Sequence, residues 1–563
     1  MNALFAALKN RKSLVCVFLG ALTGVVVGLQ ALDPQFVAGR GKWLGPENDL
    51  IAYLVAWNYY IIDRWRLPLF SLPAMGYPEG GNVLFNDGLP LTALVTKIVY
   101  RVLGVRENPF GWWVFLTYVL QGAMAARLVC AVGVRSVWAC TAAAVLAIVN
   151  ISFGSRLWHT ALSSHFVLLW VLALHFESLR RGRAKVIELS VVLALALLIN
   201  AYLFAMVFAF VVATLFALWL RGQLTRRDAR DSALGAAASV VLGIIAGYGL
   251  FLTNPTTMKS HGFGGYSWNL VSLLLPPDGV FGFLAGVSRD ATHGQYEGES
   301  YIGRGALLLL VLCLAFMPRR VFVHIKTYWV YVAMLVAFAV YAASNLVYAG
   351  DVLLIAYNLP QFAIDLGNYF RATGRFIWPL AYSLMVLPVA CIFRWWHPAA
   401  AVPVALLAVF LQVQEARPIM EYRRRQMAQP SEHLLDTRFN IWLVEHQRLW
   451  QYPSWDCGGL RGSKRAWGNR EANRELQVQL AAARLGVPTN SVYTSRVLKN
   501  CSTERAWESN PQIEDGTLYV LGLEAVEESP TLTSLARSNA CVTLEWAIVC
   551  SRSWSPMAAS GSK

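Results

Sequence analysis

Long apolar stretches recur through residues 1–413 and are separated by short polar segments. The first covers residues 13–32, and ten more lie near residues 109–131, 137–152, 165–179, 186–200, 202–220, 233–253, 302–318, 327–346, 376–394 and 397–413. A helix needs about 20 predominantly apolar residues to cross a bilayer. The pattern therefore predicts an α-helical polytopic membrane protein with about eleven transmembrane helices.

Two further apolar segments, in the loop after the first span, are too short or too interrupted to be ordinary spans. Residues 49–62 have apolar and aromatic side chains at helical spacing, and residues 89–103 contain Lys97 and Arg101. Amphipathic helices of this kind lie in the plane of a membrane interface. We expect two interfacial helices, with a short second span as the alternative for residues 89–103.

Basic residues lie on alternate loops. They cluster at residues 9–12, 127–135, 180–185, 221–230, 319–326 and 394. Cytoplasmic loops carry an excess of Lys and Arg, so we expect the N-terminus in the cytoplasm and the intervening loops outside it.

Composition supports this reading and argues against nucleic-acid binding. Hydrophobic residues make up 56% of the chain and charged residues 14%, with a mean hydropathy of +0.46. The net charge is +15, but residues 1–413 hold 30 Lys and Arg against 17 Asp and Glu, whereas residues 414–563 hold 18 against 16. The positive charge thus belongs to the membrane part, where cytoplasmic loops account for it.

Residues 414–563 have the composition of a soluble domain. We expect a helix over 471–485 and strands over 518–523 and 542–549, which indicates a small α+β accessory domain following a transmembrane domain of residues 1–413. The last expected span places this domain outside the cytoplasm.

Four cysteines lie in this domain, an even number that suits disulfides in an oxidising compartment. We expect the pairs Cys457–Cys501 and Cys541–Cys550, although four cysteines allow three pairings. The alternative is four reduced thiols in a cytoplasmic tail.

Acidic residues in the first outer loop, residues 45–90, are candidates for catalysis. Asp49 begins the segment 49–62, where it could cap a helix or, partly buried, serve as a general base. Glu47 and Asp87 are reserve carboxylates, and Asp87 also fits a turn.

Three later outer loops are rich in His, Arg, Glu and aromatic residues. Their candidate site residues are Arg156, His159, His165, Lys259, His261, Tyr266, Glu297, Tyr301, Arg304, Arg371 and Arg375. The two histidines could orient a phosphate, donate a proton or make structural hydrogen bonds. No cluster has zinc-binding spacing, so the sequence predicts no metal site.

Arg371 and Arg375 stand four residues apart, which on a helix puts both guanidinium groups on one face. Two aligned guanidinium groups suit a phosphate at a membrane surface. The alternative is that both extend to lipid headgroups.

This layout resembles the GT-C superfamily of integral-membrane glycosyltransferases. Residues 46–90, His159, His165, residues 296–301 and residues 370–379 resemble a bacterial group near which a type IV pilin arabinofuranosyltransferase belongs. The resemblance implies a multi-pass protein of the bacterial inner membrane, with its site and C-terminal domain in the periplasm.

The resemblance also implies a reaction. A sugar, for which a pentofuranose such as arabinofuranose is a candidate, moves from a polyprenyl-phosphate lipid to a protein or glycan acceptor, with inversion. In the resemblance, Asp49 matches the first-loop acid that acts as general base on the acceptor hydroxyl. Arg371 and Arg375 match residues that hold the lipid phosphate, and Lys259, His261 and Arg304 are further candidates for phosphate contact. No cofactor is implied with certainty, and a divalent metal between Glu47 and Asp49 is left open.

Two other functions remain open at this stage. A flippase or transporter of lipid-linked saccharide would need charges within its spans and repeat symmetry, and neither is evident. A glycan ligase or polymerase would use outer-loop arginines on a diphosphate-linked donor.

Overall fold

The computed structural model describes residues 2–41, 49–86, 88–250, 262–276, 289–430, 432–460, 470–496 and 501–554. It is mostly helical, at 65%. The chain divides into two compact units. The first comprises Met1–Ala38, Phe110–Leu242 and Lys259–Met427, and the second comprises Gly39–Pro109, Gly243–Met258 and Ala428–Lys563.

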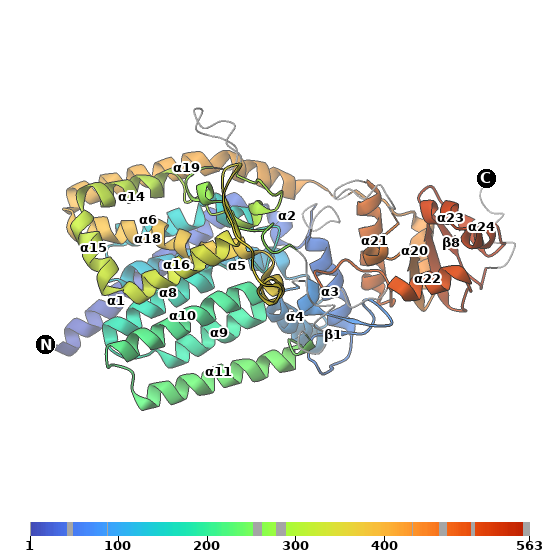
Figure 1. Ribbon diagram of the computed structural model, residues 1–563, viewed down its shortest axis with the longest axis horizontal. Helices are drawn as coiled ribbons and strands as arrows, with labels where there is room; N and C mark the ends of the chain where they lie inside the picture. The colour runs from blue at the N-terminus through green and yellow to red at the C-terminus, as the bar shows by residue number, and fades with distance from the viewer. Residues whose placement is uncertain are drawn as a thin grey trace. The chain divides into compact units, whose positions relative to one another are not determined.

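The first unit is built from helices, most of which run alongside one another in Figure 1. The longer ones are α1 (Asn2–Ala31), α5 (Phe110–Ala131), α6 (Val137–Ile148), α8 (Phe166–Arg181), α9 (Val186–Ile199), α10 (Ala201–Leu220), α11 (Arg226–Ala246), α14 (Arg304–Phe316), α15 (Pro318–Thr327), α16 (Trp329–Ala343), α18 (Trp378–Trp395) and α19 (Pro398–Ala428). Shorter elements are α2 (Pro34–Val37), α7 (Ile151–Ser155), α17 (Gln361–Gly367) and the hairpin of β3 (Leu346–Ala349) and β4 (Val352–Ala356).

Within the described residues, seven helices are long and apolar enough to cross a membrane. They are Arg11–Ala31, Phe110–Ala131, Val137–Ser155, Ala201–Leu220, Arg226–Ala246, Thr373–Trp395 and Pro398–Ala428. A chain with many apolar helices is therefore confirmed, and it is compatible with a multi-pass membrane protein.

The other expected spans are helical but differ in length or shape. α8, α9 and α16, at the segments expected near 165–179, 186–200 and 327–346, are shorter than the seven. The segment 302–318 forms α14, which ends at Phe316 and meets α15 at a bend of 97°. The eleven-span topology thus stays a prediction.

Glycines allow close helix contacts in the first unit. A Cβ atom at Gly20 of α1 would collide with the Gly122 carbonyl of α5, and one at Gly24 would collide with the Tyr118 carbonyl. Small residues let membrane helices approach closely, so these glycines hold α1 directly against α5.

The second unit combines the first long loop with the C-terminal region. The loop supplies α3 (Leu50–Ile62), β1 (Ser71–Leu72), β2 (Gly81–Asn82) and α4 (Pro90–Leu103). The C-terminal region supplies α20 (Thr437–Val444), α21 (Arg470–Leu485), α22 (Cys501–Ser509), α23 (Leu523–Glu528) and α24 (Pro530–Ala536). The Tyr59 hydroxyl of α3 donates to the Val487 carbonyl at 2.6 Å, which joins the two parts.

The C-terminal strands form one sheet in the order β5 (Arg448–Tyr452), β6 (Thr517–Gly522), β8 (Ala547–Cys550), β7 (Cys541–Thr543). β5 and β6 are parallel, and the other pairs are antiparallel. The predicted helix over 471–485 and strand over 518–523 are confirmed by α21 and β6. The single strand predicted over 542–549 is wrong, because residues between Thr543 and Ala547 turn back to form the hairpin of β7 and β8.

Both expected disulfides are present. Cys457 pairs with Cys501, and Cys541 pairs with Cys550, its direct neighbour across the β7–β8 hairpin. A hairpin is the arrangement that brings two cysteines nine residues apart within bonding reach.

The two helices of the first loop differ in exposure. Residues 50–61 of α3 are buried on every side within the second unit, unlike a helix that lies flat on a membrane with one wet face. α4 does expose apolar residues, including Val95, Ile98 and Val102, while Lys97 is buried. The expectation of an interfacial helix therefore fits α4 better than α3.

Candidate functional site

Three segments between the helices of the first unit meet at the carboxylate of Glu297. The Arg156 guanidinium, just after α7, donates from Nη1 to Glu297 Oε2 at 2.6 Å. Arg375 donates from Nε and Nη2 to the two Glu297 oxygens at 3.1 and 2.7 Å. All three side chains are at most 8% exposed. Arg156, Glu297 and Arg375, three residues singled out in the sequence, are thus brought together.

Two glycines make this meeting possible. Gly298 follows Glu297, Gly374 precedes Arg375, and a Cβ atom on Gly374 would lie 2.7 Å from the Gly298 Cα and 2.9 Å from the Ser267 carbonyl oxygen. The two backbones therefore touch without side chains between them. This contact places Glu297 and Arg375 within hydrogen-bonding reach.

We expect Gly374→Ala to destabilise the first unit. The added methyl group meets backbone atoms on two other segments, which cannot rotate away as a side chain could, and overpacking of this kind costs about 1–3 kcal/mol. Unfolding of the full chain in detergent micelles measures the loss. Gly249→Ala is the control, because nothing lies within 4 Å of a Cβ atom there; equal stability of the two variants would contradict the close contact.

The charge state of Glu297 follows from its neighbours. Burial alone would raise the pKa of the Glu297 carboxyl, but the guanidinium groups of Arg375 and Arg156, together with His159, hold that pKa well below its usual range. Glu297 is therefore ionised at neutral pH. It balances only one of the two cations that it contacts.

Arg371 lies beside this cluster without an acidic partner. Its guanidinium stands over the Tyr266 ring, 5.2 Å from the ring centre, and the Tyr266 ring meets the Tyr296 ring edge-on at 6.5 Å. Within the described ranges, no hydrogen bond or ion pair holds the Arg371 side chain. A cation stacked on an aromatic ring keeps its N–H donors free for an anion.

The expectation that Arg371 and Arg375 share one face of an α-helix is wrong. Arg371 precedes a short 3-10 helix, Thr373–Ile377, that contains Arg375. The Gly374–Gly298 contact shapes this segment, so the two guanidinium groups reach different partners.

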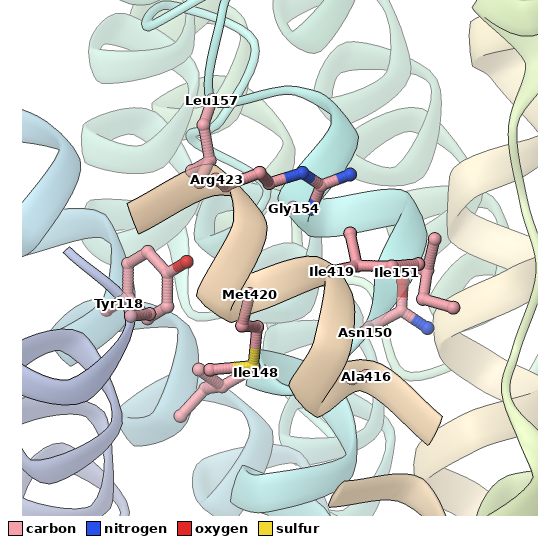
Figure 2. A pocket seen from close by; sticks show the side chains of 11 residues that line it. Tyr118, Ile148, Asn150, Ile151, Gly154, Leu157, Ala416, Ile419, Met420 and Arg423 are labelled. Carbon is pink, nitrogen blue, oxygen red and sulfur yellow. The ribbon is translucent and has the colours of Figure 1, made fainter. Parts of the chain in front are cut away.

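A further cation, Arg423 of α19, was missed in the sequence. Figure 2 shows its side chain reaching from α19 to Gly154, in a small pocket that Tyr118, Asn150 and Met420 also line. A Cβ atom at Gly154 would collide with the Arg423 guanidinium. No ion pair or hydrogen bond of Arg423 is found in the described part of the chain, although Glu299 and Arg156 act on it electrostatically. Arg423 is the first of three consecutive arginines, residues 423–425, that follow the last expected span, and basic residues at the end of a span are ordinarily explained by membrane topology.

We call these groups the arginine cluster: Arg156, Arg289, Arg371, Arg375 and Arg423 with the carboxylates Glu297 and Glu299. Arg289 pairs with Glu299 at 2.5 Å. These five guanidinium groups outnumber the two carboxylates, and they also outnumber the three carboxylates present when Asp290, next to Arg289, is counted. Such a site favours a ligand with several negative charges, and phosphate groups suit guanidinium donors.

The other predicted residues of the first unit have partners of their own. Tyr301 donates to Glu415 at 2.8 Å, and Arg304 pairs with the same carboxylate at 3.1 Å. His165 is buried and shares a hydrogen bond of 2.7 Å with the Tyr382 hydroxyl. The contacts of Tyr301 and Arg304 join the start of α14 to α19, and the contact of His165 joins the start of α8 to α18, so these residues have a structural role. His159 lies close enough to Glu297 to influence its charge.

Asp49 belongs to the second unit. Its side chain does not cap α3; instead its Oδ1 accepts a hydrogen bond of 2.8 Å from the Tyr493 hydroxyl. Asp63, at the other end of α3, pairs with Arg66 at 2.7 Å. Asp49 is therefore held in place by the C-terminal region rather than by its own helix.

Four other candidates lie outside the described residues. They are Glu47, Asp87, Lys259 and His261.

Apolar helices, a buried cation-rich cluster and a small disulfide-bonded α/β region define a helical protein of the kind compatible with multiple membrane passes. The chain belongs to the family described as Domain of unknown function (DUF6311), which matches residues 17–417. Residues 442–552 match the DUF6311 C-terminal domain. No match is found among curated proteins.

Proposed function

We propose that this chain is a GT-C-type glycosyltransferase that moves a sugar from a polyprenyl-phosphate donor to an acceptor hydroxyl. The observation that carries the proposal is the excess of positive charge in the arginine cluster, in which Arg371 and Arg423 have no acidic partner among the described residues. Arg371 and Arg423 are both half-buried. An ionisable side chain without an acidic partner marks a functional site by default in the interior of a membrane protein.

In this proposal the chain crosses the bacterial inner membrane about eleven times and acts at the periplasmic face. The acceptor is a hydroxyl of a protein or glycan, and arabinofuranose is a candidate sugar. The resemblance to GT-C enzymes and the alternation of basic loops support this orientation.

The reaction needs a proton acceptor and fixed cations. The acceptor oxygen forms a bond to the anomeric carbon, the bond from that carbon to the phosphate oxygen breaks, and the polyprenyl phosphate leaves with the electron pair. By the resemblance, Asp49 takes the hydroxyl proton and Arg371 holds the phosphate as its negative charge grows; we add Arg423, in the same unit as Arg371, to the phosphate contacts. Arg375 positions the cluster through its pair with Glu297.

We expect Arg371→Ala to reduce sugar transfer by about 10²–10³-fold, the usual effect of removing one preorganised donor. The free energy of unfolding of this variant should equal that of the wild-type chain, because Arg371 makes no ion pair within the described residues. Transfer rates with the lipid that co-purifies with the chain, identified by mass analysis, provide the measurement. Arg319→Ala on α15, an exposed arginine, is the control; equal rates for both variants would remove Arg371 from the site.

A further inference from the structure

Three buried cysteines from three helices of the first unit meet at one point. Cys16 lies on α1, Cys130 near the end of α5 and Cys140 near the start of α6, and their sulfur atoms lie within 4.8 Å of one another. The three residues are 1%, 6% and 0% exposed. None of them forms a disulfide. In the described ranges, these thiols are the only group of three potential metal ligands so close together.

The spacing of the sulfur atoms fits a shared metal ion. Zinc–thiolate bonds are about 2.3 Å long, so two thiolates on one zinc ion stand about 4 Å apart. The sulfur atoms of Cys130 and Cys140 are 3.8 Å apart. A disulfide would need them at about 2 Å, so the two thiols are not a bonded pair, and their separation is compatible with a shared metal ion as well as with a thiol–thiol hydrogen bond.

The charge around the cluster suits a divalent ion. Three thiolates on Zn²⁺ carry one net negative charge, which an apolar interior tolerates only with a compensating cation. Arg135 acts electrostatically on Cys16 and Cys130, and its Nε donates to the Ser13 hydroxyl of α1 at 2.9 Å. Cu⁺ with the same three thiolates would leave two negative charges against this one arginine.

We propose that Cys16, Cys130 and Cys140 form a zinc site in which three thiolates bind one Zn²⁺ and a water molecule completes the tetrahedral coordination. Binding releases three thiol protons to solvent. The ion links α1, α5 and α6. The site is separate from the arginine cluster and does not depend on the transfer reaction.

Metal analysis of the purified full chain tests the site. After dialysis against zinc and then against a weak chelator, we expect one zinc ion per wild-type chain and at least a tenfold lower content in Cys140→Ala. Cys313→Ala is the matched control, because Cys313 is a buried thiol on α14 that interacts with Cys391 instead. Equal zinc content in wild type and Cys140→Ala would overturn the proposal.

A second measurement needs no variant and so does not depend on mutant folding. The wild-type chain is alkylated under conditions in which it unfolds transiently. Added zinc should then protect three thiols from alkylation, and mass mapping should place them at Cys16, Cys130 and Cys140. Protection of other cysteines, a Cys130–Cys140 disulfide in the isolated chain, or preferential retention of copper over zinc would each overturn the zinc assignment.

Discussion

Replacing Asp49 by asparagine is expected to reduce sugar transfer by about 10²–10⁴-fold, the range that a general base contributes. Asparagine has nearly the same shape, and its side-chain oxygen can still accept the hydrogen bond that Tyr493 donates to Asp49 at 2.8 Å. The variant therefore keeps the hydrogen bond from Tyr493 and loses the carboxylate that takes the proton. Transfer rate and unfolding, measured on the same purified sample, separate these two effects.

Two controls accompany the Asp49→Asn variant. Tyr493→Phe removes the hydrogen bond but keeps the carboxylate, so we expect it to retain most of the activity. Asp63→Asn changes the carboxylate at the other end of α3, which pairs with Arg66, and should transfer sugar at the wild-type rate. Full activity in Asp49→Asn would remove Asp49 from the mechanism.

Glu297→Ala should have the largest effect on stability. It leaves the buried guanidinium groups of Arg156 and Arg375 without their shared carboxylate, and removing one partner of a buried ion pair costs about 3–5 kcal/mol. Glu297→Gln keeps the shape of the side chain and some of its hydrogen bonds, so this variant should lose less of the free energy of unfolding than Glu297→Ala. Unfolding of both variants in detergent micelles gives the free energies.

The control for Glu297 is Glu421→Ala on α19. Glu421 pairs with Arg417 on an exposed surface, where both side chains are solvated, so no measurable change is expected. If Glu297→Ala were as stable as Glu421→Ala, the cluster of Arg156, Glu297 and Arg375 would not be a buried, mutually dependent network.

Helix positions were predictable from the sequence because long apolar runs determine where membrane helices form. Each expected span overlaps a helix, including the short α9 at residues 186–200, although α11 ends at Ala246 and residues 251–253 of the span expected near 233–253 lie outside the described residues. Local pattern also predicted α21 and β6. The bend after Phe316 lies where the expected span 302–318 ends, at Pro318 and before the basic residues 319–326; hydropathy did not predict that this basic segment forms the helix α15.

Contacts between distant segments were harder to predict. Arg156, Glu297 and Arg375 were singled out by residue type, but their pairing depends on the Gly298–Gly374 contact, which no local pattern reveals. The burial of α3 was missed because its cover comes from α21, more than 400 residues later. Cys16, Cys130 and Cys140 lack metal-site spacing because each comes from a different helix.

The most direct test of the proposed function is sugar transfer by the purified wild-type chain in lipid vesicles. We expect formation of a glycosidic bond and release of one polyprenyl phosphate per sugar when the donor is a polyprenyl monophosphate, and no product from a polyprenyl diphosphate glycan. Movement of the lipid-linked sugar across the vesicle membrane with no glycosidic bond formed would contradict the proposal and identify a transporter.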